Sequence, residues 1–232
     1  MRVGILAHSY LAAFRIYDQL KDLPDCELFI VLSPSPSRSR WLSVLANFAR
    51  MTMSSLTSPG SHLSRLPFNR RVIFLLKAID DADSVAKLKK LNFDVGLHKS
   101  GVIYRDSTIK AFRLGILNPH IGILPAYRGR SVMEWALLNG DPVGISVFFI
   151  DTGIDTGSRV VVSEEVDISK FKSVQEAKRH LFDLDAVFFR KALMSLGSEN
   201  PVFGVNDGSG RRHFVMSKLF QGVVQDLMRV NN

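Results

Sequence analysis

The fold class is decided by residues 2–32, which read RVGILAHSYLAAFRIYDQLKDLPDCELFIVL. Residues 2–7 form a compact apolar run, residues 11–20 repeat apolar positions near helical spacing, and residues 28–32 form a second, continuous apolar run. This order predicts a strand, a helix and a second strand buried in a parallel sheet. Because strands alternate with helices, we expect an α/β protein with a mostly parallel twisted sheet and helices on both faces.

The same alternation continues along the chain. Asp80, Asp81 and Asp83 precede a stretch that ends in three lysines, which is the charge order that a helix dipole favours. Ser131 and Glu134 form a capping-box pattern at the start of another helix, which Gly140 is expected to close. Further strands are expected at residues 93–97, 115–118, 144–150 and 159–166, and the longest helical pattern covers residues 174–196.

Composition limits the class of protein. The 232 residues are 46% hydrophobic and 22% charged, which is typical of one globular domain with at most a small appendage. A net charge of +8 favours an anionic partner, and a single cysteine, Cys26, excludes an internal disulfide. The longest strongly apolar run, residues 72–76, is too short to span a membrane, and residues 3–7 are too short for a secretory signal. We therefore expect a cytoplasmic protein.

A basic segment follows the second predicted strand. Residues 28–79 contain no acidic residue and seven arginines or lysines. The segment opens with a breaker cluster at residues 33–37, so at least part of it is expected to be loop. The plainer interpretation is a solvated insertion over residues 33–77 with some helix around residues 41–53. The alternative is a surface for phosphates, nucleic acid or an anionic membrane, with weak membrane contact through residues 38–77.

Several common kinds of site are excluded or disfavoured by their motifs. The turn after the first strand lacks the glycine pattern of dinucleotide-binding proteins, and no P-loop sequence occurs. No close pair of histidines or cysteines has zinc-ligand spacing, and we expect no metal. The two Asp-Thr-Gly triplets at residues 151–153 and 155–157 lie in one loop. They cannot form the shared-proton pair of an aspartic protease, which needs carboxylates from two lobes or chains.

Asn118-Pro119-His120 ends a predicted strand. Residues i and i+2 of an extended chain point to the same side, and Pro119 keeps Asn118 extended. The amide and the imidazole are thus expected at the carboxyl end of a strand, where open α/β sheets bind ligands. Taken alone, this motif is more typical of an Asn-Pro turn with a solvent-facing histidine. Asp155 follows a helix and a strand later, in a loop with glycines that is able to return to the same edge.

The chain resembles the 10-formyltetrahydrofolate-dependent formyltransferases. The resemblance rests on residues 118–125 (NPHIGILP), on Tyr127-Arg128-Gly129, on Trp135, Gly140 and Gly144, and on residues 151–157 (DTGIDTG). It covers residues 93–166 closely and the first strand and helix loosely. It implies a Rossmann-like formyltransferase fold, and it implies 10-formyltetrahydrofolate as the formyl donor. Many relatives have Ser-Leu-Leu-Pro where this chain has residues 122–125, so Gly122 offers no side-chain hydrogen bond.

The resemblance also implies the catalytic residues, Asn118, His120 and Asp155. These residue types suit the reaction, because an amine that attacks a formyl carbon builds negative charge on oxygen and positive charge on nitrogen. Asn118 is a neutral donor that polarises the formyl oxygen. His120 either donates to that oxygen or relays a proton to the leaving nitrogen. Asp155 pairs with protonated His120 and accepts the amine proton directly or through water. For Asp151, a turn within the loop is the better interpretation.

Binding residues follow from the resemblance in the same way. The pteridine slot is expected to lie between residues 101–103 and residues 150–155, and the roles of His98 and Lys99 are open. The residues expected at the folate are Gly101, Val102, Ile103, Leu124, Pro125, Ile150, Asp151, Gly153 and Ile154. Those expected at the second substrate are His8, Tyr10, Arg128, Gly129, Arg211 and Arg212, the arginines facing a pyrophosphate.

The acceptor amine depends on the rest of the chain. His8-Ser9-Tyr10 does not resemble the phosphate loop of glycinamide ribonucleotide formyltransferases, and about thirty-six residues after Leu196 are too few for the C-terminal barrel of methionyl-tRNA formyltransferases. We read residues 1–196 as the catalytic domain and residues 197–232 as a short extension with a hairpin over residues 202–214. This extension resembles that of sugar N-formyltransferases.

The expected substrate is therefore a nucleotide-linked amino-dideoxy sugar, a precursor of surface polysaccharide such as lipopolysaccharide. Another amine acceptor, a non-catalytic binder that keeps the fold, and a polyanion- or membrane-binding protein stay open as alternatives. The sequence does not decide the sugar, its base and amino position, or whether the chain forms a homodimer.

Overall fold

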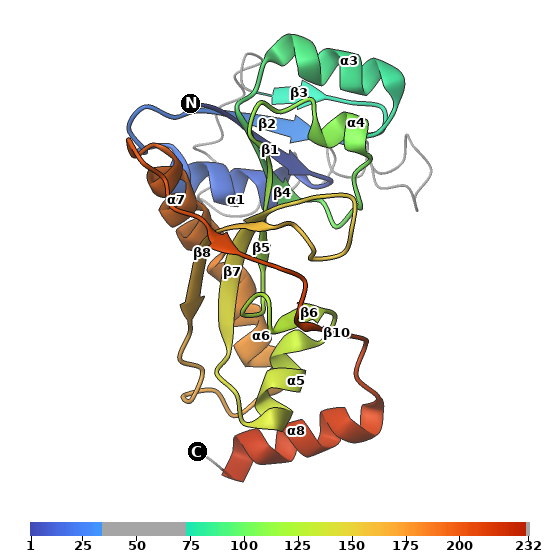
Figure 1. The fold of residues 1–232 in the computed structure, drawn as a ribbon, viewed down its shortest axis with the longest axis vertical. Helices are drawn as coiled ribbons and strands as arrows, with labels where there is room; N and C mark the ends of the chain where they lie inside the picture. The colour runs from blue at the N-terminus through green and yellow to red at the C-terminus, as the bar shows by residue number, and fades with distance from the viewer. Residues whose placement is uncertain (34–72, 231–232) are drawn as a thin grey trace, which may run out of the picture. The chain divides into compact units, whose positions relative to one another are not determined.

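The structure, a computed structural model, describes residues 1–33 and 73–230. The chain divides into two compact units, Met1–Leu114 and Gly115–Asn232 (Figure 1). Within the described ranges, no helix is both long enough and apolar enough to span a membrane. The expected helix over residues 41–53 and most of the basic segment lie outside the described residues.

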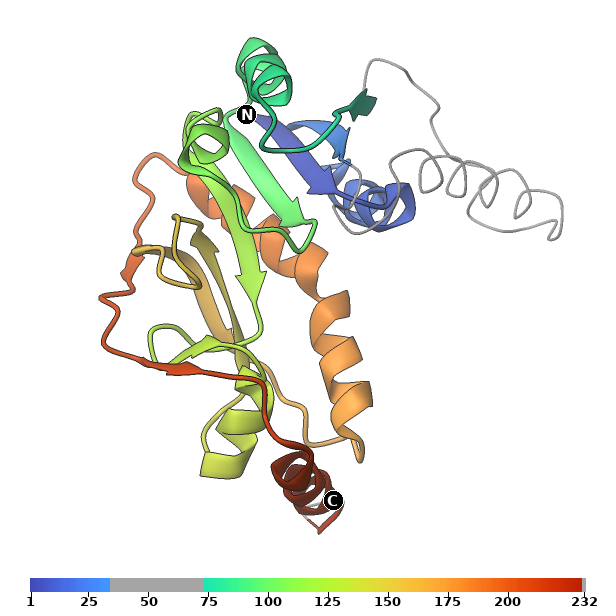
Figure 2. The ribbon, with the colours of Figure 1, turned by 90° about the vertical axis from the view of Figure 1, so that its right-hand side faces the viewer.

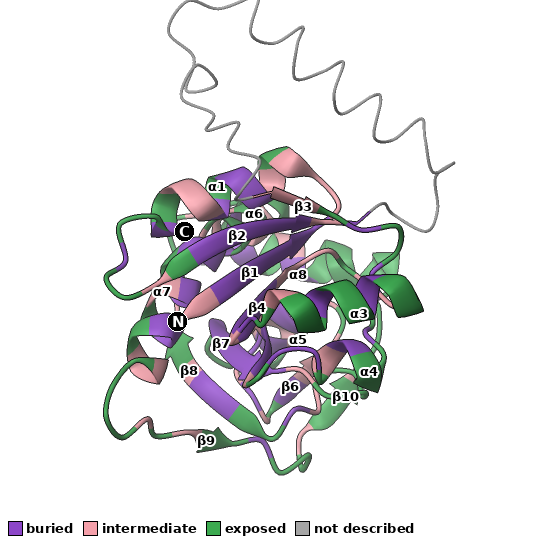
Figure 3. Cartoon of the chain, turned by 90° about the horizontal axis from the view of Figure 1, so that it is seen from above, coloured by how far each residue is buried: buried purple, intermediate pink, exposed green. Residues whose placement is uncertain are grey.

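The first unit is built on a parallel sheet with the strand order β3-β2-β1-β4. Helix α1 packs on β1 and β2, whose residues are buried over most of their length (Figure 3). The continuous apolar runs form these central strands because both faces of a parallel sheet are covered. The strands are β1 (Arg2–Ala7), β2 (Glu27–Leu32), β3 (Ile73–Leu75) and β4 (Val95–Lys99), and the helices are α1 (Tyr10–Leu20), α3 (Ala82–Leu91) and α4 (Asp106–Ile109).

Aromatic rings fill the core of this unit. The ring centroid of Phe93 lies 5.4 Å from that of Phe29 and 5.9 Å from that of Phe112. Gly4 of β1 makes this packing possible, because a Cβ at that position would lie 3.2 Å from the Phe93 ring. Helix α3 has Asp83 in its first turn and Lys89 and Lys90 in its last, which confirms the predicted charge order.

The second unit has an antiparallel sheet with the order β5-β7-β8-β9. Helices α6 and α7 follow each other along one side of it, and α7 packs on β5, β7 and β8 (Figure 2). The long helical pattern is therefore two helices, which meet at Leu184. The strands are β5 (Gly115–His120), β7 (Gly144–Phe149), β8 (Arg159–Glu165) and β9 (Gly204–Val205), and the helices are α6 (Val174–Asp183) and α7 (Asp185–Leu196).

A second, two-stranded sheet joins β6 (Tyr127–Gly129) in parallel to β10 (Arg211–His213). The predicted hairpin over residues 202–214 is thus wrong, because β9 pairs with β8 whereas β10 pairs with β6. Strands of two and three residues form too few bonds to pair alone, so the partners within the unit decide their place. The extension ends in a helix that the sequence analysis did not predict, α8 (Lys218–Val230).

Helix α5 (Val132–Asn139) ends at Gly140, which has the predicted left-handed conformation with φ 73°. The capping box at its start does not form. Ser131 itself has φ 54°, and its hydroxyl accepts a hydrogen bond from the Met216 amide at 3.3 Å. Glu134 pairs instead with Lys178 at 2.7 Å. The Ser131 hydroxyl and Glu134 Oε1 thus contact distant segments, and neither side chain forms a cap at the start of α5.

Candidate active site

Asn118 and His120 lie at the carboxyl end of β5. In the antiparallel register, Asn118 lies opposite Phe148 and His120 opposite Ser146. Because the two residues are two positions apart on one strand, their side chains leave the same face. Asn118 is half-buried, whereas the His120 side chain is 8% exposed.

The two ring nitrogens of His120 have different partners. Nε2 lies 2.8 Å from the carbonyl oxygen of Tyr127, which only accepts hydrogen bonds, so we assign the ring proton to Nε2. Nδ1 lies 3.6 Å from Oδ2 of Asp155. Gly122 leaves room for this arrangement, because a Cβ there would lie 2.7 Å from Nε2. In the neutral ring, Nδ1 is an unprotonated base that faces a carboxylate.

Asp155 is held in this position by its own backbone and by β6. Its φ of 52° lies in the left-handed region, which aspartate tolerates better than most residues. Oδ2 accepts a hydrogen bond from the Gly129 amide at 3.0 Å, and the side chain is 13% exposed. The structure therefore brings His120 and Asp155 together, although 35 positions separate them in the sequence.

Asp151, the first aspartate of the loop, has a structural role within the loop. Its Oδ1 accepts hydrogen bonds from the Gly153 amide at 2.9 Å and from the Thr156 hydroxyl at 2.6 Å. This is a turn formed by an aspartate side chain, as the sequence analysis preferred. Gly157 closes the loop tightly, because a Cβ there would lie 1.7 Å from the Phe149 carbonyl oxygen.

The three expected substrate-binding arginines lie on the two-stranded sheet. Arg212 of β10 is in register with Arg128 of β6, and aligned residues of parallel strands point to the same face. Arg211 and Arg212 are exposed, whereas Arg128 is half-buried. Within the described part of the chain, Arg128 Nε is buried without a hydrogen-bond partner. Arg128 and Arg212 thus leave the same face of this sheet, and two guanidinium groups on one face suit an anion.

The other expected substrate residues, His8 and Tyr10, belong to the first unit. His8 follows β1, and its Nδ1 lies 2.6 Å from the Ser33 carbonyl oxygen. Tyr10 begins α1 and stacks on Phe14 with 5.9 Å between the ring centroids. Burial raises the pKa of the Tyr10 hydroxyl.

The expected folate residues are divided between the two units. In the first unit, Gly101 has φ 65° and the Ile103 side chain is 66% exposed. In the second unit, Ile154 is 39% exposed, and the Leu124–Pro125 peptide bond is cis. Leu124 is buried against Phe148 and Val160, so its side chain belongs to the core of that unit.

His98, whose role the sequence left open, lies near the end of β4 beside a tyrosine. His98 Nδ1 and Ser100 Oγ lie 2.9 Å and 2.7 Å from the hydroxyl of buried Tyr104. Burial, with a smaller contribution from the charges of Lys99 and His8, lowers the pKa of His98 to about 4. His98 is therefore a neutral hydrogen-bonding group at neutral pH.

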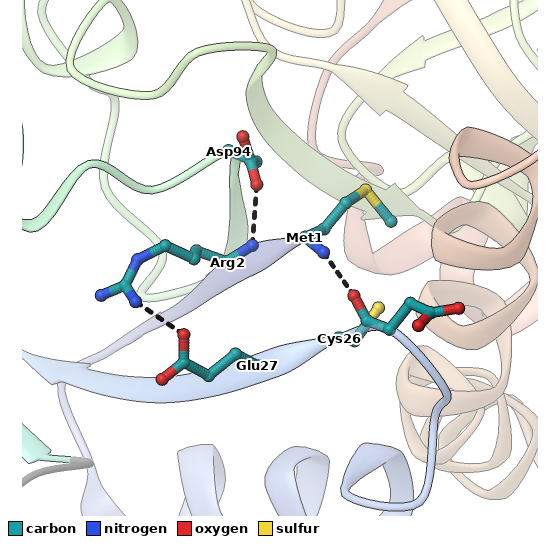
Figure 4. Close-up of a pocket in the computed structure, with 6 residues that line it drawn as sticks. Met1, Arg2, Cys26, Glu27 and Asp94 are labelled. Atoms are coloured by element: carbon teal, nitrogen blue, oxygen red, sulfur yellow. Dashed lines mark hydrogen bonds and ion pairs between the residues drawn. The ribbon is translucent and has the colours of Figure 1, made fainter.

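A separate open pocket lies at the amino ends of β1 and β2 (Figure 4). Three of its polar residues already pair with one another, since Arg2 pairs with Glu27 at 2.6 Å and the Arg2 amide donates to Asp94 at 2.8 Å. Ligands of open α/β sheets bind at the carboxyl ends of strands, and this pocket lies at the amino ends. Among the described residues, no group of three histidine, cysteine or acidic side chains is placed to hold a metal.

The sequence profile described as "Formyl transferase" matches residues 76–193, which is half of the chain. The chain belongs to the formyl transferase family. The match includes β5, the Asp155 loop and all three residues expected to be catalytic.

Curated formyltransferases match over part of their length. A methionyl-tRNA formyltransferase from Prochlorococcus marinus is 29% identical over 124 residues, which cover 53% of this chain and 36% of that protein. A second one, from Clostridioides difficile, is 27% identical over 122 residues and is covered to 39%. The chain thus spans less than half the length of the curated formyltransferases it matches.

Solved structures share the fold over nearly the whole chain. A sugar N-formyltransferase from Shewanella sp. has a TM-score of 0.64 at 13% identity, covering 98% of this chain and 87% of that one. The formyltransferase PseJ from Anoxybacillus kamchatkensis, solved with UDP-4,6-dideoxy-4-formamido-L-AltNAc and tetrahydrofolate, has a TM-score of 0.52 at 17% identity, with full coverage of both chains. The Rossmann-like α/β fold expected from the sequence is confirmed.

Two groups at the site had no signal in the sequence motifs. The Tyr127 carbonyl fixes the ring proton of His120, and a backbone carbonyl leaves no mark on residue identity. Asn206 of the C-terminal segment donates to the Asp155 carbonyl at 3.0 Å. Asn206 lies within residues 202–214, for which the sequence predicted a hairpin and no role for this side chain.

Proposed function

We propose that the protein transfers the formyl group of 10-formyltetrahydrofolate to the amine of a nucleotide-linked amino-dideoxy sugar destined for surface polysaccharide. The observation that carries the proposal is the pairing of His120 Nδ1 with the Asp155 carboxylate at 3.6 Å. His120 lies on β5, the strand that also bears Asn118. An amide donor, a base and a carboxylate near one another are the groups that acyl transfer to an amine needs.

In this proposal Asn118, His120 and Asp155 each have a separate role. The Asn118 amide donates to the formyl oxygen as negative charge develops there. His120 Nε2 is bonded to the Tyr127 carbonyl, so Nδ1 is the nitrogen that takes the proton from the attacking amine. Asp155 stabilises the imidazolium that results, and His120 then returns the proton to the departing nitrogen. When bound, 10-formyltetrahydrofolate supplies the formyl carbon: the bond to the amine forms and the bond to N10 breaks.

The Asp155 loop, which is expected to meet the folate, fits an apolar ring. Ile154 of this loop has a large side chain that is 39% exposed. An exposed isoleucine in a short loop is suited to cover a flat aromatic face, since burying it removes apolar surface from water. The turn that Asp151 makes with Gly153 and Thr156 gives the Ile154 loop a defined shape.

The sugar acceptor is supported by the arginines and by the extent of structural likeness. Arg128 and Arg212 are aligned on one face of the two-stranded sheet, as a pair that suits a pyrophosphate. The likeness to the Shewanella sugar N-formyltransferase covers 98% of the chain and so includes the C-terminal segment that contributes Arg212. PseJ was solved with a UDP-linked formamido sugar.

Methionyl-tRNA is the second candidate acceptor, because the curated formyltransferases with 27–29% identity act on it by name. The experiment supplies purified protein and 10-formyltetrahydrofolate with nucleotide-linked 3-amino and 4-amino sugars, glycinamide ribonucleotide and methionyl-tRNA in parallel. We expect tetrahydrofolate release with one amino sugar and not with the other acceptors. Release with methionyl-tRNA alone contradicts the sugar assignment, and release with none of the acceptors contradicts the proposal.

A further inference from the structure

Asn206 in the C-terminal segment is buried next to the Asp155 loop. The residue is 3% exposed and follows β9 on the way to β10 (Figure 1). Its backbone amide donates to the Ser158 carbonyl at 2.9 Å. Its Nδ2 donates to two further carbonyls, those of Asp155 at 3.0 Å and Gly157 at 3.2 Å. One side-chain amide thus bridges two peptide groups on either side of Thr156.

This bridge acts on a backbone that needs external support. Asp155 has the left-handed φ of 52°, which costs a non-glycine residue free energy, and Gly153 and Gly157 flank it with flexible positions. A buried carbonyl without a hydrogen-bond partner costs free energy. The loop arrangement in which Asn206 Nδ2 bonds to both carbonyls is therefore favoured. The direction of the peptide planes at residue 155 sets the direction of its side chain.

The same C-terminal segment also supports the far end of the Asp155 side chain. The Gly129 amide that binds Oδ2 belongs to β6, and β6 pairs with β10. The contact between these strands is close at Gly129, where a Cβ would lie 2.2 Å from the His213 carbonyl oxygen. Asn206 holds the backbone of Asp155, and β10 supports the strand that holds its carboxylate.

We propose that Asn206 is a positioning residue for catalysis: its side-chain amide fixes the loop so that the Asp155 carboxylate stays beside His120 Nδ1. The catalytic part of this inference rests on the proposed function, because it assumes that Asp155 acts in formyl transfer. The placement of the carboxylate does not depend on that assumption. Asn206 itself need not touch either substrate.

The test combines turnover with hydrogen exchange of the Gly129 amide, measured by NMR. Asn206→Ala removes both donations to the loop, and Asn200→Ala removes an exposed asparagine of the same extension as a matched control. We expect Asn206→Ala to lower kcat about a hundredfold with little change in either KM, since small misplacements of catalytic groups have effects of that size. The Gly129 amide should exchange roughly tenfold faster, because its acceptor is no longer held. Asn200→Ala should match the wild-type protein in both measurements.

The double variant Asp155→Asn/Asn206→Ala separates positioning from general damage. If Asn206 acts through Asp155, adding Asn206→Ala to Asp155→Asn causes no further loss of kcat. The inference is overturned if Asn206→Ala leaves Gly129 exchange and kcat at wild-type values, if exchange changes without kcat, or if the two kcat losses multiply. Should Asn206→Ala not fold, Asn206→Asp keeps the shape, removes both donations and is measured instead.

Failure of the proposed function gives a different result. In that case Asp155→Asn retains wild-type turnover, or no acceptor is formylated, while Gly129 exchange still reports whether Asn206 holds the carboxylate. The proposed function and the positioning of Asp155 are therefore judged by separate measurements.

Discussion

At the scale of the residue, the hydrogen-bond partners of the two His120 ring nitrogens determine which nitrogen is able to exchange a proton. His120 donates from Nε2 to the Tyr127 carbonyl, which leaves Nδ1, 3.6 Å from Asp155, as the nitrogen available to exchange a proton. Asn118 leaves the same face of β5 and carries no charge. Its side chain is suited to donate to a formyl oxygen, and it cannot replace the base.

The Asn118→Ala variant tests that role. We expect kcat to fall about a hundred- to thousandfold, because a preorganised donor to a developing oxyanion has an effect of this size. Steady-state release of tetrahydrofolate measures it. Since Asn118 is expected to act on the transition state, the KM values should change little. A loss that appears in KM alone would assign Asn118 to substrate binding.

His98 gives a pH-dependent prediction for stability. The unfolded chain takes up a proton on His98 near its ordinary pKa of 6.5, whereas the folded protein does so only near 4. Between these values the unfolded state binds more protons, so falling pH favours unfolding, by up to about 3 kcal/mol from pH 6.5 to pH 4. The stability that depends on neutral His98 is therefore fully present above pH 6.5 and is lost as the pH falls toward 4.

Urea unfolding across this pH range compares wild type with His98→Gln, which has no proton to gain. We expect the free energy of unfolding to depend less steeply on pH in the variant. Equal slopes in the two proteins would show that His98 is not the group responsible.

At the scale of elements, the sequence was informative where many residues repeat one pattern. The apolar runs of residues 2–7 and 28–32 predicted β1 and β2, because a strand buried on both faces requires apolar residues throughout. The short strands β9 and β10 were mispredicted, since their partners β8 and β6 lie far away in the sequence. The proximity of His120 and Asp155 agrees with the resemblance, whereas the backbone contacts of Tyr127 and Gly129 depend on the folded chain.

Gly129→Ala tests the close pairing of β6 with β10. Gly129 has φ 102°, and an added Cβ would meet the His213 carbonyl oxygen. We expect a loss of about 1–3 kcal/mol in the free energy of unfolding, measured by denaturant, because the side chain imposes strain and separates the strands. Gly222→Ala in α8 is the matched control. It has open space around it and should stabilise the helix by about 0.5–1 kcal/mol. Equal effects of the two substitutions would contradict the close pairing.

At the scale of the whole molecule, the net charge of +8 is the feature that the formyl transferase family does not explain. Residues 28–79 carry seven positive and no negative side chains, and most of them lie outside the described residues. The alternative of a polyanion- or membrane-binding protein rests on this segment. A solvated insertion is the plainer interpretation of the sequence, and for these residues it stays a prediction.

Sedimentation with anionic vesicles, at low and at physiological ionic strength, distinguishes these interpretations. We expect association at physiological ionic strength to be no stronger than that of a variant in which Arg38, Arg40 and Arg50 are serines, because salt at this concentration weakens charge-based attraction to lipid headgroups. Vesicle binding that persists at this ionic strength and disappears in the variant would favour a membrane-associated role.

The most direct test of the account is the rate of tetrahydrofolate release by Asp155→Asn and His120→Ala with the acceptor that the wild-type protein formylates. Asp167→Asn, at an exposed aspartate that accepts a hydrogen bond from the nearby Ser169 amide at 2.8 Å, serves as the control. We predict that each of the two active-site variants loses about a hundred- to ten-thousandfold in kcat while keeping the wild-type fold, and that the control does not. Full activity in both active-site variants would contradict the assignment of acyl-transfer chemistry to this pair.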